Sequence, residues 1–130
     1  MTTRNGLRVL VVDDASDNAE MLAELVATFG HTVRIAHEGA AALALLDQEA
    51  ADLVFLDIGL PDASGFDIAA SIRSRHGRAC RIVALTGYSD AEARDAARDA
   101  GFDAFLVKPF DFARIEALLS VDSQPEARPT

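Results

Sequence analysis

The sequence predicts an α/β fold, a doubly wound domain in which helices cover both faces of a five-stranded parallel sheet. Short apolar runs alternate five times with segments of helical periodicity, which is typical of strand–helix–strand crossovers. The first and third runs are almost continuously apolar, as expected for strands buried on both faces of a parallel sheet. The 130 residues give room for one such domain.

Five apolar runs are predicted to be strands, because each ends in polar or turn-forming residues. In chain order they are residues 7–12, 33–36, 53–56, 81–85 and 104–107. Four of them end directly before a residue with a charged or hydroxyl side chain. These residues are Asp13, Asp57, Thr86 and Lys108. The carboxyl ends of parallel strands meet at one edge of a sheet, so these side chains are expected to lie together.

Five segments between and after the strands are predicted to be helices. In chain order they are residues 17–29, 40–48, 66–75, 91–100 and 112–119. In the first, Asp17 and Glu20 have the spacing of a capping box, and Gly30 suits the position just beyond the helix end. The apolar residues of this first helix recur at helical spacing. The second helix is rich in Ala and Leu. A Ser-Gly pair opens the third helix, and a glycine ends the Ala-rich fourth helix.

Composition and charge exclude several classes of protein. The formal net charge is −9, and an acidic surface repels the phosphate backbone of nucleic acids. No apolar run approaches the ~20 residues of a membrane span, and no secretory signal follows Met1. Cys80 is the only cysteine, so no internal disulfide forms, which agrees with a reducing compartment. We therefore expect a cytoplasmic domain whose partners are proteins and cations, with no nucleic acid and no membrane.

The expected domain fills residues 7–120. Residues 1–6 are expected to be a short N-terminal lead. Residues 121–130, in which Pro125 and Pro129 stand among polar residues, have no periodicity and are expected to form a flexible C-terminal tail.

Asp13, Asp14 and Asp57 bring three carboxylates to the predicted strand edge, with Lys108 as the nearby cation. Each residue alone has an ordinary structural role, since aspartates cap helices or end strands and lysines are solvated. Together the acids repel one another, by ~4 kcal/mol for like charges ~4 Å apart at an effective dielectric constant of ~20. One lysine compensates too little, so the cluster requires protonation or a cation. Oxygen ligands without His or Cys favour Mg²⁺, and Mg²⁺ points to phosphoryl chemistry.

Four motifs at the strand ends resemble those of a known family. They are Val11-Val12-Asp13-Asp14 with Asn18, Leu56-Asp57-Ile58-Gly59-Leu60-Pro61 with Ser64-Gly65, Ala84-Leu85-Thr86-Gly87-Tyr88, and Val107-Lys108-Pro109-Phe110. In this order they make the chain resemble the receiver domain of two-component response regulators, over roughly residues 7–119. The resemblance implies a flavodoxin-like (βα)5 fold with strand order 2-1-3-4-5. It is strongest to receivers of hybrid histidine kinases and to single-domain regulators.

The resemblance implies that Asp57 is the phosphoacceptor of a phosphorelay, with a histidine kinase or a histidine phosphotransfer protein as the donor. Asp14 and Asp57 would bind Mg²⁺ directly, the backbone carbonyl of Gly59 would be a third protein ligand, and Asp13 would act through a bound water. Mn²⁺ is the expected substitute. Lys108 would pair with the phosphoryl oxygens. Such a domain catalyses only its own phosphorylation and dephosphorylation and is not otherwise an enzyme.

The output step that the resemblance implies depends on Thr86 and Phe105. The Thr86 hydroxyl would donate a hydrogen bond to a phosphoryl oxygen, and Phe105 would swing inward as Thr86 moves. The surface affected would be formed by the helix at 91–100, the strand at 104–107 and the helix at 112–119. A downstream protein would bind there, and a homodimer is a further possibility.

Three positions depart from the commonest receiver pattern: Gly59, Ala63 and Tyr88. Gly59 offers no side chain over the site, and Tyr88 lies two residues after Thr86, so both bear on how readily water reaches the phosphoryl group. Ala63 is smaller than the usual apolar residue. Pro109, by contrast, matches the family's cis proline, which would aim the preceding lysine into the site.

Two other functions remain open from the sequence. One is a Mg²⁺-dependent phosphatase with Asp57 as its nucleophile, although such enzymes usually carry a second acid two residues later, where this chain has Gly59. The other is a pseudo-receiver that only binds partners, an alternative weakened by the presence of all the expected site residues. Histidines 31, 37 and 76 are dispersed, so we expect solvated loop or edge positions for them and neither a zinc site nor a histidine phosphoacceptor.

Overall fold

The computed structural model describes residues 6–62, 64–77, 80–87, 91–108 and 111–121. Within these ranges five parallel strands form one sheet, in the order β2-β1-β3-β4-β5. The strands are β1 (Arg8–Val12), β2 (Thr32–Ala36), β3 (Leu53–Asp57), β4 (Arg81–Thr86) and β5 (Ala104–Val107). The helices are α1 (Ser16–Thr28), α2 (Gly39–Gln48), α3 (Gly65–His76), α4 (Ala91–Ala100) and α5 (Phe112–Val121). The predicted fold class and strand order are confirmed.

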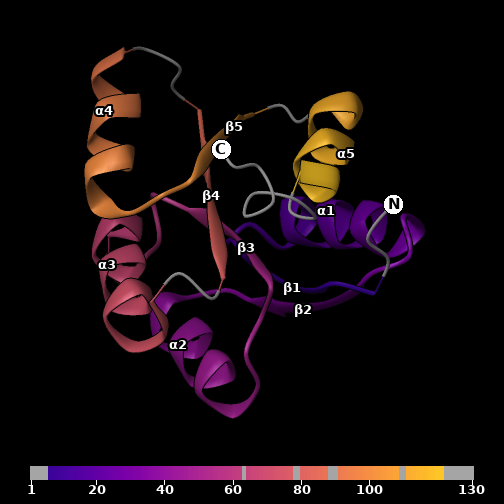
Figure 1. Cartoon of the computed structure of the whole chain (residues 1–130), viewed down its shortest axis with the longest axis horizontal. Helices are drawn as coiled ribbons and strands as arrows, with labels where there is room; N and C mark the ends of the chain where they lie inside the picture. The colour runs from indigo at the N-terminus through magenta and orange to yellow at the C-terminus, as the bar shows by residue number, and fades with distance from the viewer. Residues whose placement is uncertain (1–5, 63, 78–79, 88–90, 109–110, 122–130) are drawn as a thin grey trace.

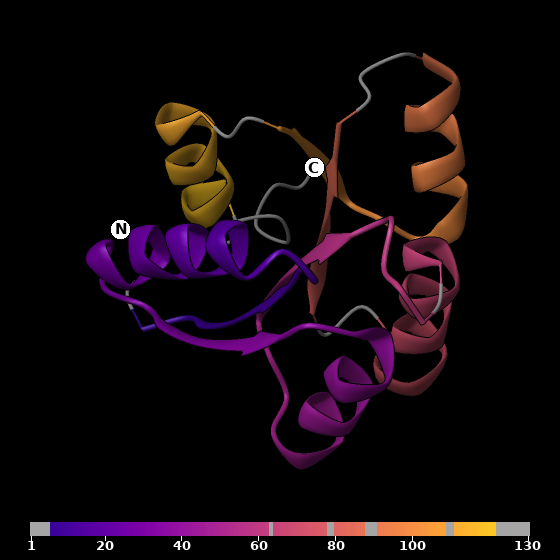
Figure 2. The same ribbon diagram turned by 180° about the vertical axis from the view of Figure 1, so that it is seen from behind.

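The helices form two layers around the sheet (Figure 1 and Figure 2). α1 and α5 cover one face, and α2, α3 and α4 cover the other. Strand β3 contributes side chains to the core on both faces of the sheet, and all five of its residues are buried. Val54 and Leu56 join the core cluster that includes α2 and α3, whereas Leu53 and Phe55 join the cluster that includes α1 and α5. Burying each such side chain contributes about 1.5–3 kcal/mol, so these two layers are the main source of stability.

The start of α1 differs from the prediction. The helix begins one residue earlier, with Ala15 in the N-cap position, so the predicted capping box of Asp17 and Glu20 is wrong. Asp17 lies in the first turn, where its charge favours the positive end of the helix dipole. Asp13 Oδ1 accepts a hydrogen bond from the Ala15 N–H at 3.0 Å, so a residue of the preceding loop orders the helix start. Gly30 follows the helix with φ 95°, the left-handed conformation predicted for a glycine there.

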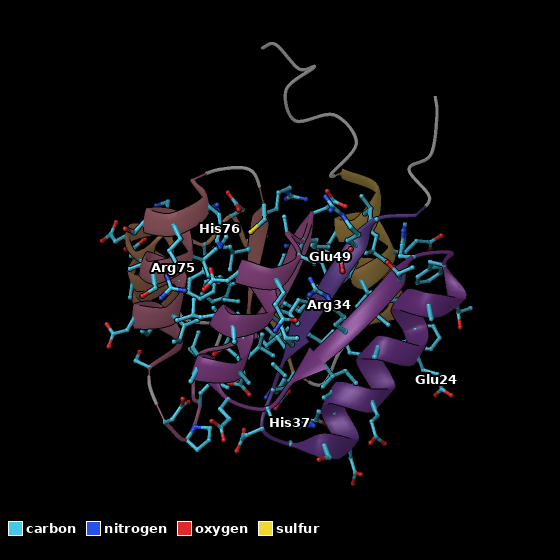
Figure 3. The ribbon with its side chains drawn as sticks, turned by 90° about the horizontal axis from the view of Figure 1, so that it is seen from below. Glu24, Arg34, His37, Glu49, Arg75 and His76 are labelled. Carbon is cyan, nitrogen blue, oxygen red and sulfur yellow. The ribbon has the colours of Figure 1, made fainter. Side chains whose placement is uncertain are left out.

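Two helices extend beyond their predicted ends, since α3 continues to His76 and α5 to Val121. His76 is therefore helical, and Figure 3 shows it at the opposite end of the molecule from His37. His31 does not have the predicted solvated position, because it is 7% exposed and its Nδ1 accepts a hydrogen bond from the Leu7 N–H at 3.2 Å. Residues 1–5 of the expected lead and 122–130 of the expected tail lie outside the described residues.

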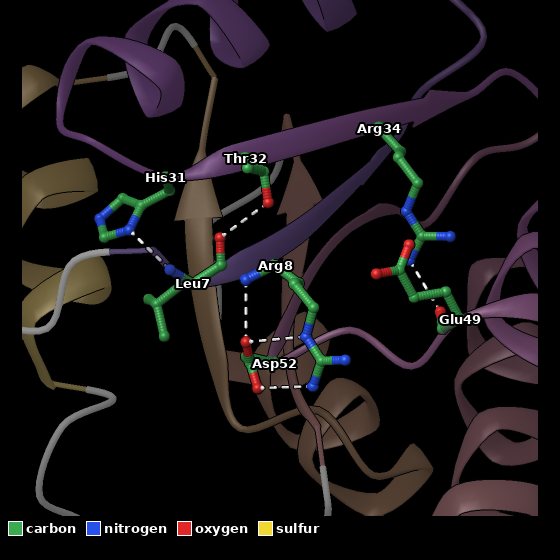
Figure 4. A network of polar contacts seen from close by, with 7 residues as sticks. All are labelled: Leu7, Arg8, His31, Thr32, Arg34, Glu49 and Asp52. Atoms are coloured by element: carbon green, nitrogen blue, oxygen red, sulfur yellow. Dashed lines mark hydrogen bonds and ion pairs between the residues drawn. The ribbon is translucent and has the colours of Figure 1, made fainter.

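The amino-terminal ends of the strands are joined by hydrogen bonds between side chains and backbone (Figure 4). Asp52 accepts a hydrogen bond from the Arg8 N–H at 2.8 Å and forms an ion pair with the Arg8 guanidinium at 3.4 Å. Arg34 on β2 donates to the carbonyl oxygens of Leu45 and Glu49, at 3.0 and 2.8 Å. These carbonyls lie at the end of α2, where the Glu49 N–H also donates to Leu45 O at 3.0 Å, so Arg34 adds donors to the last turn of the helix. At the edge of the sheet opposite the acidic cluster, these contacts hold β1 to Asp52 and β2 to the end of α2.

Gly65 allows α3 to begin directly against the end of β3. A Cβ at this position would lie 2.4 Å from Ile58 Cα and 2.5 Å from Asp57 O, which is closer than any side chain allows. The Gly65 N–H donates to Ile58 O at 3.0 Å, and the Ser64 side chain caps the helix by accepting from the Phe66 N–H at 3.1 Å. The predicted helix opening at Ser64 and Gly65 is confirmed.

We predict that Gly65→Ala lowers the free energy of unfolding by about 3 kcal/mol, because backbone atoms on both sides must shift. The matched control is Gly59→Ala, whose Cβ would lie 3.7 Å from Asp57 Oδ1, an ordinary contact. This control is expected to change the free energy by less than about 1 kcal/mol. Urea unfolding of both variants checks the difference, and equal midpoints would contradict the packing argument.

Candidate functional site

The carboxyl ends of four strands bring polar side chains to one edge of the sheet. Asp57 is the last residue of β3, and Asp13 and Asp14 follow β1. Thr86 is the last residue of β4, and Lys108 follows β5. Carboxylate oxygens of the three aspartates lie within 4.8 Å of one another. The structure therefore brings these acids together, as the parallel topology predicts.

Lys108 lies between the two buried acids of the cluster. Its Nζ donates a hydrogen bond to Asp57 Oδ2 at 2.8 Å and lies 3.5 Å from Asp13 Oδ2. The other oxygen of Asp57, Oδ1, accepts a hydrogen bond from the Gly59 N–H at 2.8 Å. Both oxygens of Asp57 thus have a donor, and the carboxylate is held in one orientation while only 7% of the residue is exposed.

The cluster has too little positive charge for its acids. Asp13 is fully buried, and burial raises the pKa of its carboxyl. The Ala15 N–H and Lys108 oppose this effect, whereas Asp57 reinforces it. Asp13 Oδ2 has no hydrogen-bond partner within the part of the chain that the structure describes. Burial by itself lowers the pKa of Lys108, but the hydrogen bond and charge of Asp57, with Asp13, raise it overall, so the lysine stays charged.

The donor set fits a hard divalent cation. The cluster consists of three carboxylates and contains no histidine or cysteine, and Mg²⁺ prefers oxygen ligands. Asp13 Oδ2 has spare acceptor capacity, and Asp14 is exposed, so the cluster is open to solvent on the Asp14 side. The residues present therefore suit the Mg²⁺ that the sequence implied.

Two further residues of the expected site lie near Asp57. Thr86 is on the neighbouring strand β4, and Gly59 is in the loop that follows Asp57. Thr86 is 2% exposed, and its carbonyl accepts a hydrogen bond from the Lys108 N–H at 2.8 Å. In the sheet register Leu85 pairs with Asp57, so Thr86 lies one residue further along the neighbouring strand. Gly59 is exposed and forms an isolated antiparallel bridge with Ser64, which closes the base of the loop after Asp57.

Phe105 is partly buried, packed against the core cluster that includes residues of α2, α3 and α4. Its carbonyl accepts a hydrogen bond from Arg114 Nη2 at 3.2 Å, which links β5 to α5. A groove of about 490 Å³ is lined by residues of α4, β5, α5 and the connections between them. Its lining includes Ala97, Arg98, Phe102, Phe105, Val107 and Arg114. The surface expected to respond to phosphorylation therefore contains a recess.

Two residues that the sequence did not place at the site make contacts at the acidic loops. His37 Nδ1 lies 3.0 Å from the Asp13 carbonyl oxygen, and the Asp62 carboxylate accepts hydrogen bonds from the backbone at the start of α2. The partners in these contacts are 22 to 24 positions apart, so no local pattern in the sequence signals them. Four residues of the expected site region lie outside the described residues: Ala63, Tyr88, Pro109 and Phe110.

Comparison with known proteins decides the family of the chain. A family model described as the response regulator receiver domain matches residues 9–120, a range that contains every strand-end residue above. The chain belongs to the response regulator receiver family. It is a receiver domain of two-component signalling, a family in which phosphorylation and Mg²⁺ binding are general features.

This receiver domain is similar to curated response regulators. It is 39% identical over 120 residues to the transcriptional regulatory protein GltR of Pseudomonas aeruginosa, covering 88% of this chain and 50% of that protein. It is 36% identical over 117 residues to the response regulator MprA of Mycobacterium ulcerans, covering 87% of this chain and 50% of that protein. The chain thus spans about half the length of these curated relatives.

Solved receiver structures share the fold. A two-component response regulator from Clostridium difficile superposes with a TM-score of 0.85 at 25% identity, over 90% of this chain and 95% of that one. The chemotaxis response regulator CheY4 of Vibrio cholerae gives a TM-score of 0.83 at 26% identity, over 88% of this chain and 97% of that one.

In the described part of the receiver domain, every helix is too short or too polar to cross a bilayer.

We predict that Asp13→Asn raises the melting temperature of the receiver domain by a few degrees at neutral pH in a chelator. Asn keeps an acceptor for the Ala15 N–H but removes a buried charge, and burial makes that charge unfavourable, as the raised pKa of Asp13 indicates. The gain should shrink as the pH falls through the raised pKa, because the native carboxyl then becomes protonated, and it should vanish below the ordinary pKa. Calorimetry over this pH range checks the prediction, and a lower melting temperature for the variant at pH 7 would refute it.

Proposed function

We propose that this receiver domain accepts a phosphoryl group from a phosphohistidine onto Asp57 and then switches the surface formed by α4, β5 and α5. The observation that supports the proposal most strongly is the environment of Asp57. Its carboxylate is 7% exposed, accepts hydrogen bonds from the Gly59 N–H and Lys108, and lies beside Asp13 and Asp14. A strand end without a chemical role needs no such concentration of charge.

Asp57 acts as the nucleophile. One carboxylate oxygen attacks phosphorus, an O–P bond forms, and the N–P bond to the donor imidazole breaks, with its electron pair remaining on the nitrogen, which then takes up a proton. The Gly59 N–H and Lys108 orient the carboxylate before the donor arrives, which reduces the entropy lost on reaching the attacking geometry. Lys108 also lies where its ammonium can pair with the incoming phosphoryl oxygens.

Asp14, Asp57 and the backbone carbonyl of Gly59 would hold Mg²⁺ directly, and Asp13 would hold it through a water. Mn²⁺ suits the same oxygen ligands. When bound, the ion neutralises negative charge on the phosphoryl oxygens. Two observations support this ligand set: Asp13 Oδ2 accepts no hydrogen bond from the residues that the structure describes, and the cluster has more carboxylates than ammonium groups.

Thr86 and Phe105 convert the modification into a changed surface. A phosphoryl group brings new negative charge and strong acceptor oxygens, toward which the Thr86 hydroxyl moves, and Phe105 then turns into the space that is vacated. Helix α4 suits a moving element, because Ala97 is the only buried residue among 95–100 and little apolar area holds that half in place. The recess lined by α4, β5 and α5 is where a downstream protein or a second copy of the chain would bind.

The partners of the domain are expected to be proteins. The phosphodonor is a histidine kinase or a histidine phosphotransfer protein, and the net charge of −9 supports a protein target rather than nucleic acid for residues 7–120. GltR carries the name of a transcriptional regulator, but this chain spans only half of it. We assign the domain to the cytoplasm, with residues 1–6 as a lead. Because α5 continues to Val121, the proposed tail is shortened to residues 122–130.

The domain is a signalling switch, and the catalysis that we propose is limited to its own phosphorylation and dephosphorylation. Exposed Gly59 leaves the region beside Asp57 without a side chain, so water has access to the phosphoryl group and the modification is reversible. The same glycine disfavours a phosphatase acting on other substrates, because it occupies the position where such an enzyme needs its second acid.

We predict that the parent protein gains one phosphoryl group, about 80 Da, on exposure to acetyl phosphate and Mg²⁺, and that Asp57→Asn does not. Asn keeps the shape of the side chain but lacks the nucleophilic charge. Intact mass spectrometry measures both, with Asp52→Asn at the opposite edge of the sheet as the control that is still modified. If Asp57→Asn gained the phosphoryl mass, Asp13 or Asp14 would be the acceptor and the assignment would be wrong.

We also predict that Thr86→Ala accepts the phosphoryl group but transmits less of the response. Without the hydroxyl no hydrogen bond pulls the end of β4 toward the phosphoryl oxygens, so amide chemical-shift changes in α4 and β5 should fall to less than about half of those in the parent. Thr28→Ala, which removes a threonine hydroxyl bonded to Glu24 O on α1, is the control with a full response. A full response from Thr86→Ala would show that the signal takes another route.

A further inference from the structure

Residues 37–40, which are the connection between β2 and α2 and the first two residues of α2, contact both acidic loops although they contribute no acid to the cluster. His37 Nδ1 donates a hydrogen bond to the Asp13 carbonyl at 3.0 Å, and this nitrogen carries the hydrogen because a carbonyl only accepts. The Asp13 N–H in turn donates to the carbonyl of Ala36, the last residue of β2, at 3.1 Å. The end of β2 and the residue after it therefore hold both backbone groups of Asp13. Figure 3 shows His37 at this end of β2.

Asp62 makes the corresponding contact from the loop after Asp57. Its Oδ1 and Oδ2 accept hydrogen bonds from the N–H groups of Gly39 and Ala40, at 2.9 and 3.1 Å. These residues begin α2, whose own N-cap residue, Glu38, makes no side-chain cap. Asp62 thus caps α2 from another loop, and the two N–H groups lower the pKa of its carboxyl.

The loop that Asp62 anchors also carries Gly59. Its base is closed by the bridge between Gly59 and Ser64, while Leu60 packs into the core. Beyond Leu60 the residues at 61 and 62 are exposed, so within the described part of the loop Asp62 supplies the hydrogen bonds that join this segment to a helix. The position of the Gly59 carbonyl therefore depends on an anchor three residues further on.

We propose that residues 37–40 form a brace that positions both acidic loops, with Asp62 as the positioning residue for the Gly59 carbonyl and His37 as that for Asp13. The inference rests on the proposed function, because that function makes Gly59 and Asp13 part of the cation site. A braced loop has less conformational freedom to lose when the cation binds, so binding is tighter. Loss of an outer contact of this kind typically weakens metal affinity by 10–100-fold.

The first test measures the Mg²⁺ dissociation constant of five proteins by isothermal titration calorimetry, well below their melting temperatures. Asp62→Ala should bind Mg²⁺ about tenfold more weakly than the parent, and Asp62→Asn should fall between the two, because Asn keeps one acceptor oxygen for the Gly39 and Ala40 N–H groups where Asp has two. Asp52→Ala is the matched control. It removes the same charge and also a carboxylate that accepts from a backbone N–H, that of Arg8 at 2.8 Å, but at the opposite edge of the sheet.

A merely structural role for Asp62 would make the two alanine variants alike, with parent-like Mg²⁺ affinity in each, and that result would overturn the brace. His37→Ala is expected to weaken binding by a smaller factor than Asp62→Ala, because Asp13 keeps its hydrogen bond to Ala36. A failure of the proposed function is distinguishable, since the parent would then neither bind Mg²⁺ nor gain the phosphoryl mass.

The second test measures amide hydrogen exchange without any cation, so its result depends on the brace and not on Mg²⁺ binding. The amides of Gly59 and Gly65, which donate to Asp57 Oδ1 and Ile58 O, should exchange hydrogen about tenfold faster in Asp62→Ala than in the parent without Mg²⁺. Asp52→Ala should leave both rates unchanged. Equal exchange rates in the parent and Asp62→Ala would overturn the proposal, whatever the affinity for Mg²⁺.

Discussion

The imbalance of charge at the carboxyl edge of the sheet is the constraint on which the rest of the site depends. Parallel strands bring Asp13, Asp14 and Asp57 within 4.8 Å of one another, and Lys108 is the ammonium that contacts the two buried acids. Burial makes the charge of Asp13 more costly and raises its pKa, and among the described residues its Oδ2 accepts no hydrogen bond and has only the ion pair with Lys108. The apolar layers on both faces of the sheet offset the repulsion, so the domain keeps a charge arrangement that, on the proposed function, a bound cation relieves.

Backbone groups do most of the positioning around these acids. The N–H groups of Ala15 and Gly59 each hold one carboxylate oxygen, and the N–H groups at the start of α2 hold Asp62. Gly65 brings the start of α3 into direct contact with the end of β3, which fixes one end of the loop between them. Side chains with chemical roles are thus supported by rigid elements, which keeps them oriented in the absence of any ligand. This support also explains why residues outside the acidic cluster are expected to influence its affinity.

Apolar periodicity predicted the strands and their order in the chain, and parallel topology then placed Asp57, Thr86 and Lys108 on one edge. What the sequence missed depends on contacts between distant segments. The start of α1 is a local exception: the spacing of Asp17 suggested a capping box, but Asp13, two residues before Ala15, orders that helix start instead. Burial of His31 depends on its bond to the Leu7 N–H, 24 positions away. The cap that Asp62 provides for α2 likewise has no local signature, because it follows from how two loops meet in the folded chain.

We propose that the acidic cluster is a cation site and that bound Mg²⁺ relieves the repulsion between its carboxylates. The most direct measurement is calorimetric unfolding of the parent protein in millimolar Mg²⁺ and in chelator, with Asp14→Ala measured alongside. Mg²⁺ at ~100 times its dissociation constant should add ~2.7 kcal/mol to the stability of the parent, which raises its melting temperature by several degrees. Asp14→Ala should lose this response. A parent melting temperature that is the same in Mg²⁺ and in chelator would contradict the account.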